Sequence, residues 1–419
     1  MTKDFLYITQ AFPDDKGGGT EQRAATNLRG LCGLGRVHLL RLGRRRPRGP
    51  APDLSRLLAS ETYLGDIVSE HSKLFRSELQ PSLVTRLTRR AWALSGILLP
   101  FTTKQAKAIR LALPVQRFGA IFAFQLTAAC VARSLGVAGA NSKWVLDWDF
   151  LESPNVVDWA KGRRGGRLSP LQWIAARFNQ AKVRRIESNL LRTWDIHLCS
   201  SELDTHWLAR RAKGKIVRSV TNAVSVPDQM PPYPVNTPPT VVYVASLSYW
   251  PNADGILHFL DEVWPRVRDH APDARLNIVG RAPPAAVQSR SGVHGVTVTS
   301  DVPSVAPYYL KAHVAIVPLR FVMGSNLKLV EAMAYGRPVV SYASACKRLN
   351  VGPESGVFPV TNSAEFADTL VTLLRDQPMA YDMGTKAHAA AVVLFSKTVA
   401  HHQLAAAFDA VPSEVPRSA

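Results

Sequence analysis

Short runs of β-branched and aromatic residues alternate with longer helix-forming stretches along almost all of the chain, and this alternation constrains its fold more than any other feature. Strands that alternate with helices are typical of parallel sheets covered by helices on both faces. The expected strands span residues 5–8, 37–42, 120–124, 144–147, 196–199 and 216–220 in the first half, and 241–244, 276–279, 296–298, 314–317, 339–341 and 357–360 in the second. The sequence therefore predicts an α/β protein with two Rossmann-like, doubly wound domains, in which ligands bind at the carboxyl ends of the strands.

A proline-rich segment separates the two series of strands. Residues 226–239 contain six prolines in fourteen positions, and proline cannot donate the backbone hydrogen bonds of a helix or a sheet. The chain also exceeds the roughly 250 to 300 residues at which a single core stops growing. We expect an N-terminal Rossmann-like domain over 1–225, a linker over 226–239, a C-terminal Rossmann-like domain over 240–395 and a terminal helix or tail over 396–419, with the two domains facing each other across a cleft.

The formal net charge of +19 is carried almost entirely by the first half of the chain. Residues 1–230 contain 36 lysines and arginines against 18 aspartates and glutamates, whereas residues 231–419 contain 15 against 14. A basic half suits either a nucleic acid or an anionic membrane surface. A nucleic-acid-binding protein would interleave aromatic residues with the charge or carry a recognition module. Because neither pattern is present, we expect no nucleic acid partner and an anionic membrane as the partner of the basic domain.

The stretch 70–113 is basic and helix-prone, with a tryptophan at Trp92. It fits a helix on a membrane surface, and its spacing fits equally well a pair of helices that covers the sheet and exposes its charges. The longest apolar run, 91–101, is too short to span a bilayer. Four widely separated cysteines favour a reducing compartment over a disulfide framework or a metal site. We expect a cytoplasmic protein, peripheral at the inner face of the plasma membrane.

A glycine-rich turn follows the first expected strand. Gly18 and Gly19 lie just before a helix that begins near Glu21. Glycines allow backbone N–H groups to approach a ligand, and a helix N-terminus favours phosphate. The spacing is neither that of the dinucleotide fingerprint nor that of the Walker loop. The turn is a candidate anion site or an ordinary flexible turn.

A second candidate site follows the strand 314–317. That strand delivers Arg320 to its carboxyl end, and a helix beginning near Leu327 sets Lys328 and Glu331 one turn apart. A diphosphate needs a cation and a helix N-terminus, whereas a ribose diol needs a carboxylate that accepts two hydroxyl hydrogen bonds. The alternative for an isolated lysine and glutamate at this spacing is a surface ion pair.

The run GSNLKLVEAMAYGRPVVS, residues 324–341, resembles the donor-site segment of the family 4 retaining glycosyltransferases, which have the two-domain GT-B fold. Residues 246–254, 278–281 and 302–309 match the same family, as does the turn with Gly18, Gly19 and Glu21. The resemblance covers nearly all of the second domain through about Asp376 and is patchy over the first. It is strongest to the branch that assembles bacterial surface polysaccharides and exopolysaccharides.

The resemblance implies a role for each matched residue. Glu331 should hold the ribose of the donor nucleotide, and Lys328 with Arg320 or Arg281 should neutralise its diphosphate. The full set of implied donor-binding residues is Glu331, Lys328, Asn326, Ser325, Gly324, Leu327, Arg281, Ser246, Gly18 and Gly19. Many members place a further glutamate eight residues before the ribose-binding one. Here that position is Met323, which leaves open whether the reaction retains or inverts the anomeric configuration.

The expected catalytic residues are Asp147, Asp149 and Arg320. Asp147 and Asp149 end a strand of the first domain, where Asp149 could orient or deprotonate an acceptor hydroxyl; a helix cap is the equally weighted alternative. Gln125 ends the neighbouring strand, near where the family often presents a histidine. Because cations and helix N-termini can stabilise a departing diphosphate, we expect no metal and no cofactor besides the nucleotide-sugar substrate.

The sequence as a whole predicts a glycosyltransferase of the hexosyltransferase type. It would move a sugar from a UDP or GDP donor to a saccharide or lipid-linked saccharide acceptor, with retention as the expected outcome, in cell-surface polysaccharide biosynthesis. Two alternatives remain at this stage. One is a sugar-nucleotide epimerase of the same fold, and the other is a nucleic-acid-binding protein that uses the basic N-terminal half.

Overall fold

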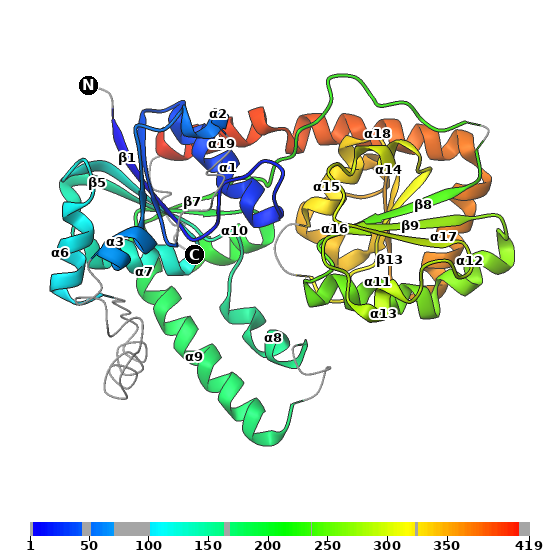
Figure 1. Ribbon diagram of the computed structural model, residues 1–419, viewed down its shortest axis with the longest axis horizontal. Helices are drawn as coiled ribbons and strands as arrows, with labels where there is room; N and C mark the ends of the chain where they lie inside the picture. Colours follow the sequence, from blue (N-terminus) through cyan, green and yellow to red (C-terminus); the bar gives the residue numbers. More distant parts are fainter. Residues whose placement is uncertain are drawn as a thin grey trace, which may run out of the picture. The chain divides into compact units, whose positions relative to one another are not determined.

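The computed structural model describes residues 3–43, 52–70, 101–162, 168–235, 237–322 and 326–409. The chain forms two compact units (Figure 1). Unit 1 comprises Met1–Thr221 and Ala400–Ala419, and unit 2 comprises Asn222–Val399. Most of the basic stretch 70–113, together with Gly324 and Ser325, lies outside the described residues.

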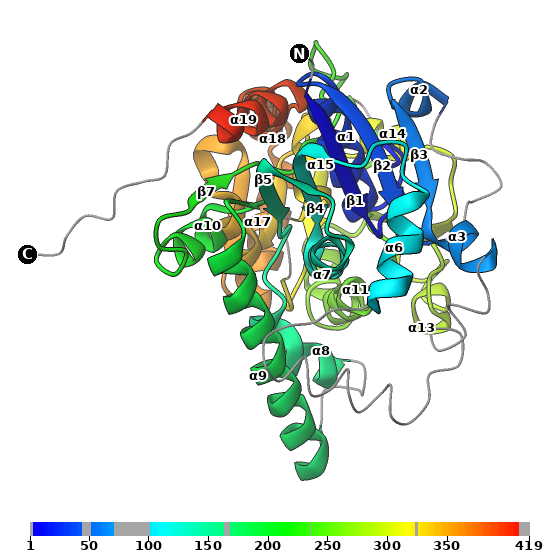
Figure 2. The same cartoon turned by 90° about the vertical axis from the view of Figure 1, so that its left-hand side faces the viewer.

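Unit 1 is built on a seven-stranded parallel sheet with helices on both faces (Figure 2). The sheet order is β3-β2-β1-β4-β5-β6-β7. The strands are β1 (Asp4–Thr9), β2 (Arg36–Arg41), β3 (Ser60–Tyr63), β4 (Phe118–Phe124), β5 (Ala138–Asp147), β6 (Ile196–Cys199) and β7 (Ile216–Ser219). The helices are α1 (Gly19–Cys32), α2 (Pro52–Ser55), α3 (Leu64–Glu70), α6 (Thr103–Leu111), α7 (Gln125–Leu135), α8 (Val156–Gly162), α9 (Pro170–Thr193) and α10 (Glu202–Ala209).

Unit 2 repeats this plan with a six-stranded parallel sheet in the order β10-β9-β8-β11-β12-β13. The strands are β8 (Thr240–Val244), β9 (Arg275–Gly280), β10 (Val296–Ser300), β11 (Val314–Val317), β12 (Val339–Tyr342) and β13 (Val357–Val360). The helices are α11 (Trp250–Glu262), α12 (Trp264–His270), α13 (Ala285–Gln288), α14 (Ala306–Leu310), α15 (Leu327–Ala334), α16 (Ala343–Leu349), α17 (Ser363–Arg375) and α18 (Gln377–Phe395). The predicted α/β fold of two doubly wound units is confirmed.

All twelve predicted strands are present, because central parallel strands are buried on both faces and read as continuous apolar runs. β8 and β11, for example, are buried at every position. The edge strand β3 was not predicted. Its sequence SETY is polar and only half-buried, so it lacks the apolar run by which the others are found.

The strand order reverses between β1 and β4 in unit 1 and between β8 and β11 in unit 2. In an open parallel sheet, the carboxyl edge beside such a reversal is where ligands bind. The candidate residues after β1, β4 and β5, and those after β8, β9 and β11, follow strands at or next to these two positions.

The proline-rich segment packs against unit 2. The Tyr233 hydroxyl donates to the carbonyl of His313 at 3.0 Å, and the Arg337 guanidinium donates to the carbonyl of Pro232. The division between the units therefore falls at Thr221–Asn222 instead of within 226–239.

The C-terminal helix α19 (Lys397–Asp409) returns the chain to unit 1 from Ala400 onward. Phe408 packs edge-on against Phe5 of β1 with ring centroids 5.4 Å apart. The Lys143 ammonium group donates to the Phe408 carbonyl at 2.5 Å. The described part of the segment expected as a helix or tail, through Asp409, is thus a helix that packs against unit 1.

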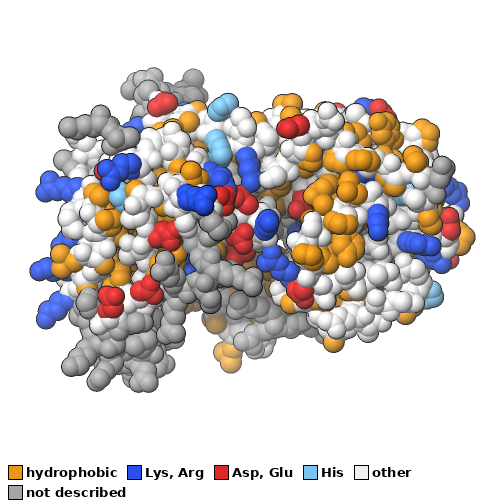
Figure 3. Space-filling view, turned by 45° about the horizontal axis from the view of Figure 1, so that its top comes forward, with side chains coloured by type: hydrophobic (Ala, Val, Ile, Leu, Met, Phe, Trp, Pro, Cys, Tyr) orange, Lys and Arg blue, Asp and Glu red, His pale blue; other side chains and the backbone are white. Residues whose placement is uncertain are grey.

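Surface charge follows the asymmetry of the sequence. On the face seen in Figure 3, lysine and arginine side chains are spread over unit 1 at the left, and hydrophobic side chains gather on unit 2 at the right. No helix within the described ranges is both long enough and apolar enough to cross a bilayer.

Gly280 ends β9 in close contact with the end of β8. A Cβ atom at this position would lie 1.8 Å from the carbonyl oxygen of Ala245. We expect Gly280→Ala to lower the free energy of unfolding of unit 2 by about 1–3 kcal/mol, because the two strands must separate to admit the methyl group. Thermal unfolding measures the change. Gly33→Ala is the matched control, since its nearest atom is 3.4 Å away; an equal effect of both substitutions would contradict the close packing.

Candidate functional site

The candidate donor site lies at the carboxyl edge of the unit 2 sheet. Ser246 follows β8, Arg281 follows β9, and Arg320 follows β11. The Leu247 amide donates to the Arg281 carbonyl at 3.0 Å, which holds the segments after β8 and β9 together. The α15 helix begins at the same edge, because it follows β11 in the chain. The fold thus gathers residues from four separate parts of the sequence.

Asn326 is the residue that caps the start of α15, and Leu327 is the first residue of the helix. The Asn326 side chain is buried, and its Nδ2 atom has no hydrogen-bond partner among the described residues. A buried donor without a partner costs free energy. An acceptor oxygen of a bound ligand would satisfy this donor.

Glu331 is half-buried one turn into α15, and a tyrosine orients it. The Tyr309 hydroxyl of α14 donates to Glu331 Oε2 at 3.2 Å. The Tyr309 ring is buried and stacks on Tyr335, with centroids 4.7 Å apart and planes 11° apart. Burial raises the pKa of Glu331, an effect that the hydroxyl of Tyr309 and the charge of Lys328 oppose. The sequence assigned no role to Tyr309, which we identify as a positioning residue for Glu331.

Lys328 lies three residues before Glu331 on the same helix and is half-buried. No described residue forms a hydrogen bond or an ion pair with its ammonium group. Burial lowers the pKa of Lys328 to about 8, although the Glu331 carboxylate opposes this shift. An anion that binds beside this buried ammonium group would stabilise its charged form.

The pKa of Lys328 predicts a pH dependence for anion binding. A diphosphate that pairs with the Lys328 ammonium group raises the pKa of that group. The affinity that this ion pair contributes is therefore fully present below pH 8 and is lost as the pH rises above 8. We expect diphosphate affinity to be level near neutral pH and to fall above pH 8 by at most about tenfold for each pH unit. Calorimetric titration across this range measures it. Lys328→Met should give a level profile, and a profile unchanged by the substitution would exclude Lys328 as the titrating group.

Arg320 is held by a carboxylate of its own unit. Its guanidinium donates to both oxygens of Asp254 on α11, at 3.0 and 2.7 Å, and its side chain is exposed. The Asp254 carboxylate raises the pKa of Arg320. Arg320 would have to share its charge with Asp254 in order to act on a diphosphate. Arg281 and Ser246 are exposed at the same edge, where Ser246 Oγ lies 3.2 Å from Ser248 Oγ.

Asp147 of unit 1 is fully buried and its carboxylate is saturated with donors. Arg23 of α1 contributes Nε at 2.9 Å and Nη2 at 2.8 Å, Asn27 contributes Nδ2 at 2.6 Å, and the Asp149 amide donates at 2.9 Å. Burial alone would lower the pKa of Arg23. The neighbouring carboxylates of Asp147 and Asp149 raise this pKa above its ordinary value. The expectation that Asp147 takes part in catalysis is corrected by this geometry, because no oxygen of it remains for a substrate. Asp147 is a positioning residue for Asp149.

Asp149 and Gln125 form a second polar contact at the carboxyl edge of the unit 1 sheet. Gln125 Nε2 donates to Asp149 Oδ2 at 3.4 Å, and the Ser200 hydroxyl donates to the Asp149 carbonyl at 2.6 Å. Both residues have positive φ angles, 71° for Gln125 and 57° for Asp149. Such strain costs of order 1–3 kcal/mol for a non-glycine residue and concentrates at functional sites. Asp149 is therefore the stronger catalytic candidate of the two aspartates.

Gly18 and Gly19 lie at the start of α1 as predicted, but the chain satisfies part of this helix end itself. Gly18 caps the helix, and its amide donates to the Glu21 carboxylate at 2.9 Å. A ligand that approaches this turn would meet that carboxylate. The geometry therefore favours a helix start that the Glu21 carboxylate caps over an open anion site.

Comparison with known proteins finds a family that unit 2 resembles. Residues 238–376 match the family described as Glycosyl transferases group 1. This segment is similar to the domain that defines that family. It includes the Lys328 and Glu331 pair, Asn326, Arg281, Ser246 and Arg320. No curated protein matches the sequence of the chain significantly.

Solved structures with a similar fold extend over both units. Sucrose-phosphate synthase from Thermosynechococcus elongatus aligns with a TM-score of 0.66 at 18% identity, covering 97% of this chain and 98% of that one. HepE from Anabaena, in complex with UDP and glucose, aligns with a TM-score of 0.63 at 14% identity, covering 97% and 99%. A mutant of S. aureus TarM in complex with UDP, alpha-GlcNAc-glycerol and fondaparinux aligns with a TM-score of 0.63 at 9% identity, covering 97% and 100%. At these identities the likeness shows the fold, the two-domain GT-B architecture.

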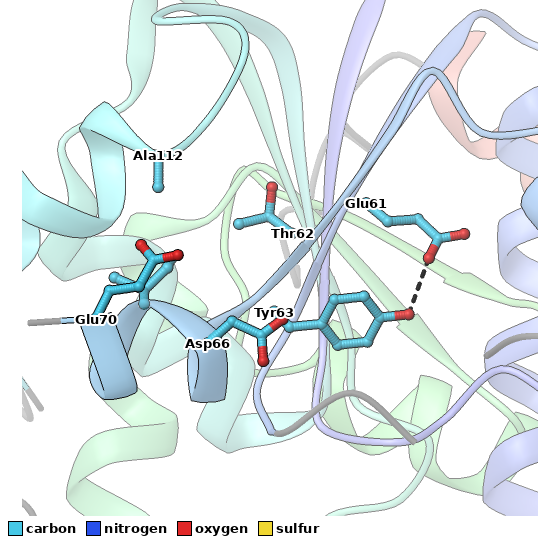
Figure 4. A pocket seen from close by; sticks show the side chains of 7 residues that line it. Glu61, Thr62, Tyr63, Asp66, Glu70 and Ala112 are labelled. Atoms are coloured by element: carbon cyan, nitrogen blue, oxygen red, sulfur yellow. Dashed lines mark hydrogen bonds between the residues drawn. The ribbon is translucent and has the colours of Figure 1, made fainter. Parts of the chain in front are cut away.

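No group of three histidine, cysteine, aspartate or glutamate side chains in the described parts of the chain could hold a metal ion. Unit 1 does contain an acidic hollow of about 340 Å³, lined by Glu61, Asp66 and Glu70 with Thr62, Tyr63, Ile67 and Ala112 (Figure 4). The Tyr63 hydroxyl donates to Glu61 at 2.8 Å. Three carboxylates repel a diphosphate, so this hollow is not a candidate diphosphate site.

Proposed function

We propose that this protein transfers a sugar from a nucleoside diphosphate sugar, with UDP or GDP as the leaving group, to a saccharide or lipid-linked saccharide acceptor in cell-surface polysaccharide biosynthesis. One observation carries the proposal. An available Lys328 and an oriented Glu331 stand together at the start of α15, within the segment that matches the group 1 glycosyl transferase family. The complexes of HepE and TarM with UDP support a UDP-linked donor.

Each donor residue has a role that its surroundings favour. Glu331, which Tyr309 orients, accepts hydrogen bonds from the two ribose hydroxyls. Lys328 pairs with the diphosphate, whose negative charge stabilises the ammonium form that burial disfavours. Nδ2 of Asn326, which has no partner among the described residues, donates to a phosphate or sugar oxygen. Backbone amides of 324–327 are proposed to complete the site, with Arg281 and Arg320 supplying further positive charge.

The transfer breaks the bond between the anomeric carbon and the phosphate oxygen, and the diphosphate leaves with the bonding electrons. The acceptor hydroxyl oxygen forms the new bond, and Asp149 is proposed to receive its proton. Fixed cations and the N-terminus of α15 stabilise the departing charge, so we propose that no metal ion is required. We further propose that the anomeric configuration is retained, which the proton NMR spectrum of the product would test.

The basic first half supports a location at the inner face of the plasma membrane, where positive charge meets anionic lipid. The acceptor would then be presented beside unit 1.

Titration of the purified protein with UDP, GDP and ADP tests the donor site. We expect one of these nucleotides to bind, and Lys328→Ala to weaken its binding by about tenfold or more, as for the loss of a charged hydrogen bond. Lys386→Ala is the matched control, because Lys386 is an exposed lysine of unit 2 that pairs with Asp382 at 2.9 Å. Binding of no nucleotide, or equal loss in both variants, would contradict the proposed donor site.

A further inference from the structure

The helix α9 carries large apolar side chains that the described residues of unit 1 leave exposed. Leu171, Trp173, Ile174 and Phe178 are 80%, 50%, 58% and 59% exposed. Leu171, Ile174 and Phe178 are spaced three and four residues apart, which places them on one face of the helix. Isolated exposed apolar residues are common, but four within eight residues on one helix form a patch that marks an interaction site.

The rest of α9 is anchored, so its first turns project from the body of unit 1. The buried residues of α9 start at Ala176 and include Gln180, Ile186, Glu187 and Leu190. Gln180 Nε2 donates to the Ser153 carbonyl at 2.8 Å, and Glu187 accepts from the amides of Glu152 and Ser153. Figure 2 shows α9 extending away from the sheet with α8 beside its projecting part. The apolar patch therefore lies at the far end of a firmly based helix.

The charge of α9 is of one sign on its exposed surface. Its five basic residues are Arg177, Lys182, Arg184, Arg185 and Arg192, and its one acidic residue, Glu187, is buried. The guanidinium of Arg177 lies 5.7 Å from the centre of the Trp173 ring. Arg184 follows Phe178 by about 9 Å along the helix axis. An apolar end with an aromatic residue, followed by cations, is the pattern of a segment that enters the interface of an anionic bilayer.

We propose that the first turns of α9 dock on an anionic lipid bilayer, with Leu171, Trp173, Ile174 and Phe178 entering the interfacial region and the basic residues meeting lipid phosphates. The same cations oppose the alternative occupant, the identical face of a second copy of this chain, because the two faces would repel each other. The inference gives the membrane contact of the proposed function a defined surface and rests on that part of it. It does not depend on the nucleotide site.

Sedimentation of the full-length protein with vesicles tests the inference. We expect binding to vesicles of phosphatidylcholine and phosphatidylglycerol in equal parts, little binding to pure phosphatidylcholine, and a decrease as salt is added. The triple variant L171S/I174S/F178S should bind at least about tenfold less, since it removes most of the apolar area that would enter the interface. The control variant L111S/L203S/V293S removes three exposed apolar side chains elsewhere and should bind like the unmodified protein.

The outcomes separate the inference from the proposed function. Equal binding of both triple variants overturns the role of α9 and leaves the membrane contact in place. No binding of the unmodified protein overturns both, while nucleotide titration of the same samples shows whether the donor site stands. A dimer in light scattering that L171S/I174S/F178S abolishes, without vesicle binding, would overturn the inference in favour of a second copy.

Discussion

Replacing Glu331 with alanine is expected to weaken the binding of the donor nucleotide by about 10- to 150-fold, or about 1.5–3 kcal/mol. The carboxylate is oriented by Tyr309 and stands beside a lysine without a partner among the described residues. In the bound nucleotide, the two ribose hydroxyls have given up their hydrogen bonds to water. Removal of the Glu331 carboxylate then leaves these hydroxyls with no charged acceptor. Calorimetric titration with the nucleotide that binds the unmodified protein measures the loss.

Two further variants sharpen this result. Tyr309→Phe removes only the hydroxyl that orients Glu331 and should weaken binding by less than Glu331→Ala, because the charge remains. Glu262→Ala removes an exposed carboxylate of unit 2 and should leave the affinity unchanged. If Glu331→Ala binds the nucleotide like the Glu262→Ala control, the ribose-binding role of Glu331 is wrong.

Replacing Arg23 with methionine is expected to lower the free energy of unfolding of unit 1 by about 3–5 kcal/mol. The substitution leaves the fully buried Asp147 carboxylate without the two hydrogen bonds that neutralise its charge. Native-state hydrogen exchange at the amides of β4 and β5 measures this unit separately from unit 2.

The double variant R23M/D147L should recover part of the loss, because it removes both buried charges. The recovery stays incomplete, since Asn27 and the Asp149 amide lose their acceptor. Arg29→Met is the control on the same helix. Arg29 pairs with Asp15 at 2.7 Å near the surface, where an ion pair contributes about 0–1 kcal/mol. A loss in Arg23→Met no larger than that in Arg29→Met would contradict the structural role of the buried pair.

The sequence predicted those parts of the fold and site that local pattern determines. The β11 strand was predicted with its observed bounds, because all four of its residues are buried and apolar. The spacing of Lys328 and Glu331 predicted their places one turn apart on α15. Their joint role came from the resemblance to the donor-site segment and stays a prediction. The edge strand β3 escaped prediction, since half-buried polar residues carry no strand signal.

Contacts between residues far apart in the chain could not be predicted in the same way. Arg23 and Asp147 are 124 positions apart, and they meet only because the Arg23 side chain of α1 reaches the end of β5 in the folded unit. The sequence therefore named both aspartates as catalytic candidates, and only the structure shows that the Asp147 carboxylate is saturated with donors. Tyr309 likewise reaches Glu331 across 22 residues. Its one sequence signal was its place in a segment that resembles the donor-site family.

Turnover of a donor tests the central claim most directly. The full-length protein would be incubated separately with UDP-glucose, UDP-N-acetylglucosamine and GDP-mannose, with water or an added saccharide as acceptor, and followed by phosphorus NMR. We predict that at least one donor releases free nucleoside diphosphate at a rate proportional to enzyme, and that Glu331→Ala does not. Conversion of a donor into a stereoisomeric sugar nucleotide without diphosphate release, or no reaction with any donor, would contradict the assignment as a glycosyltransferase.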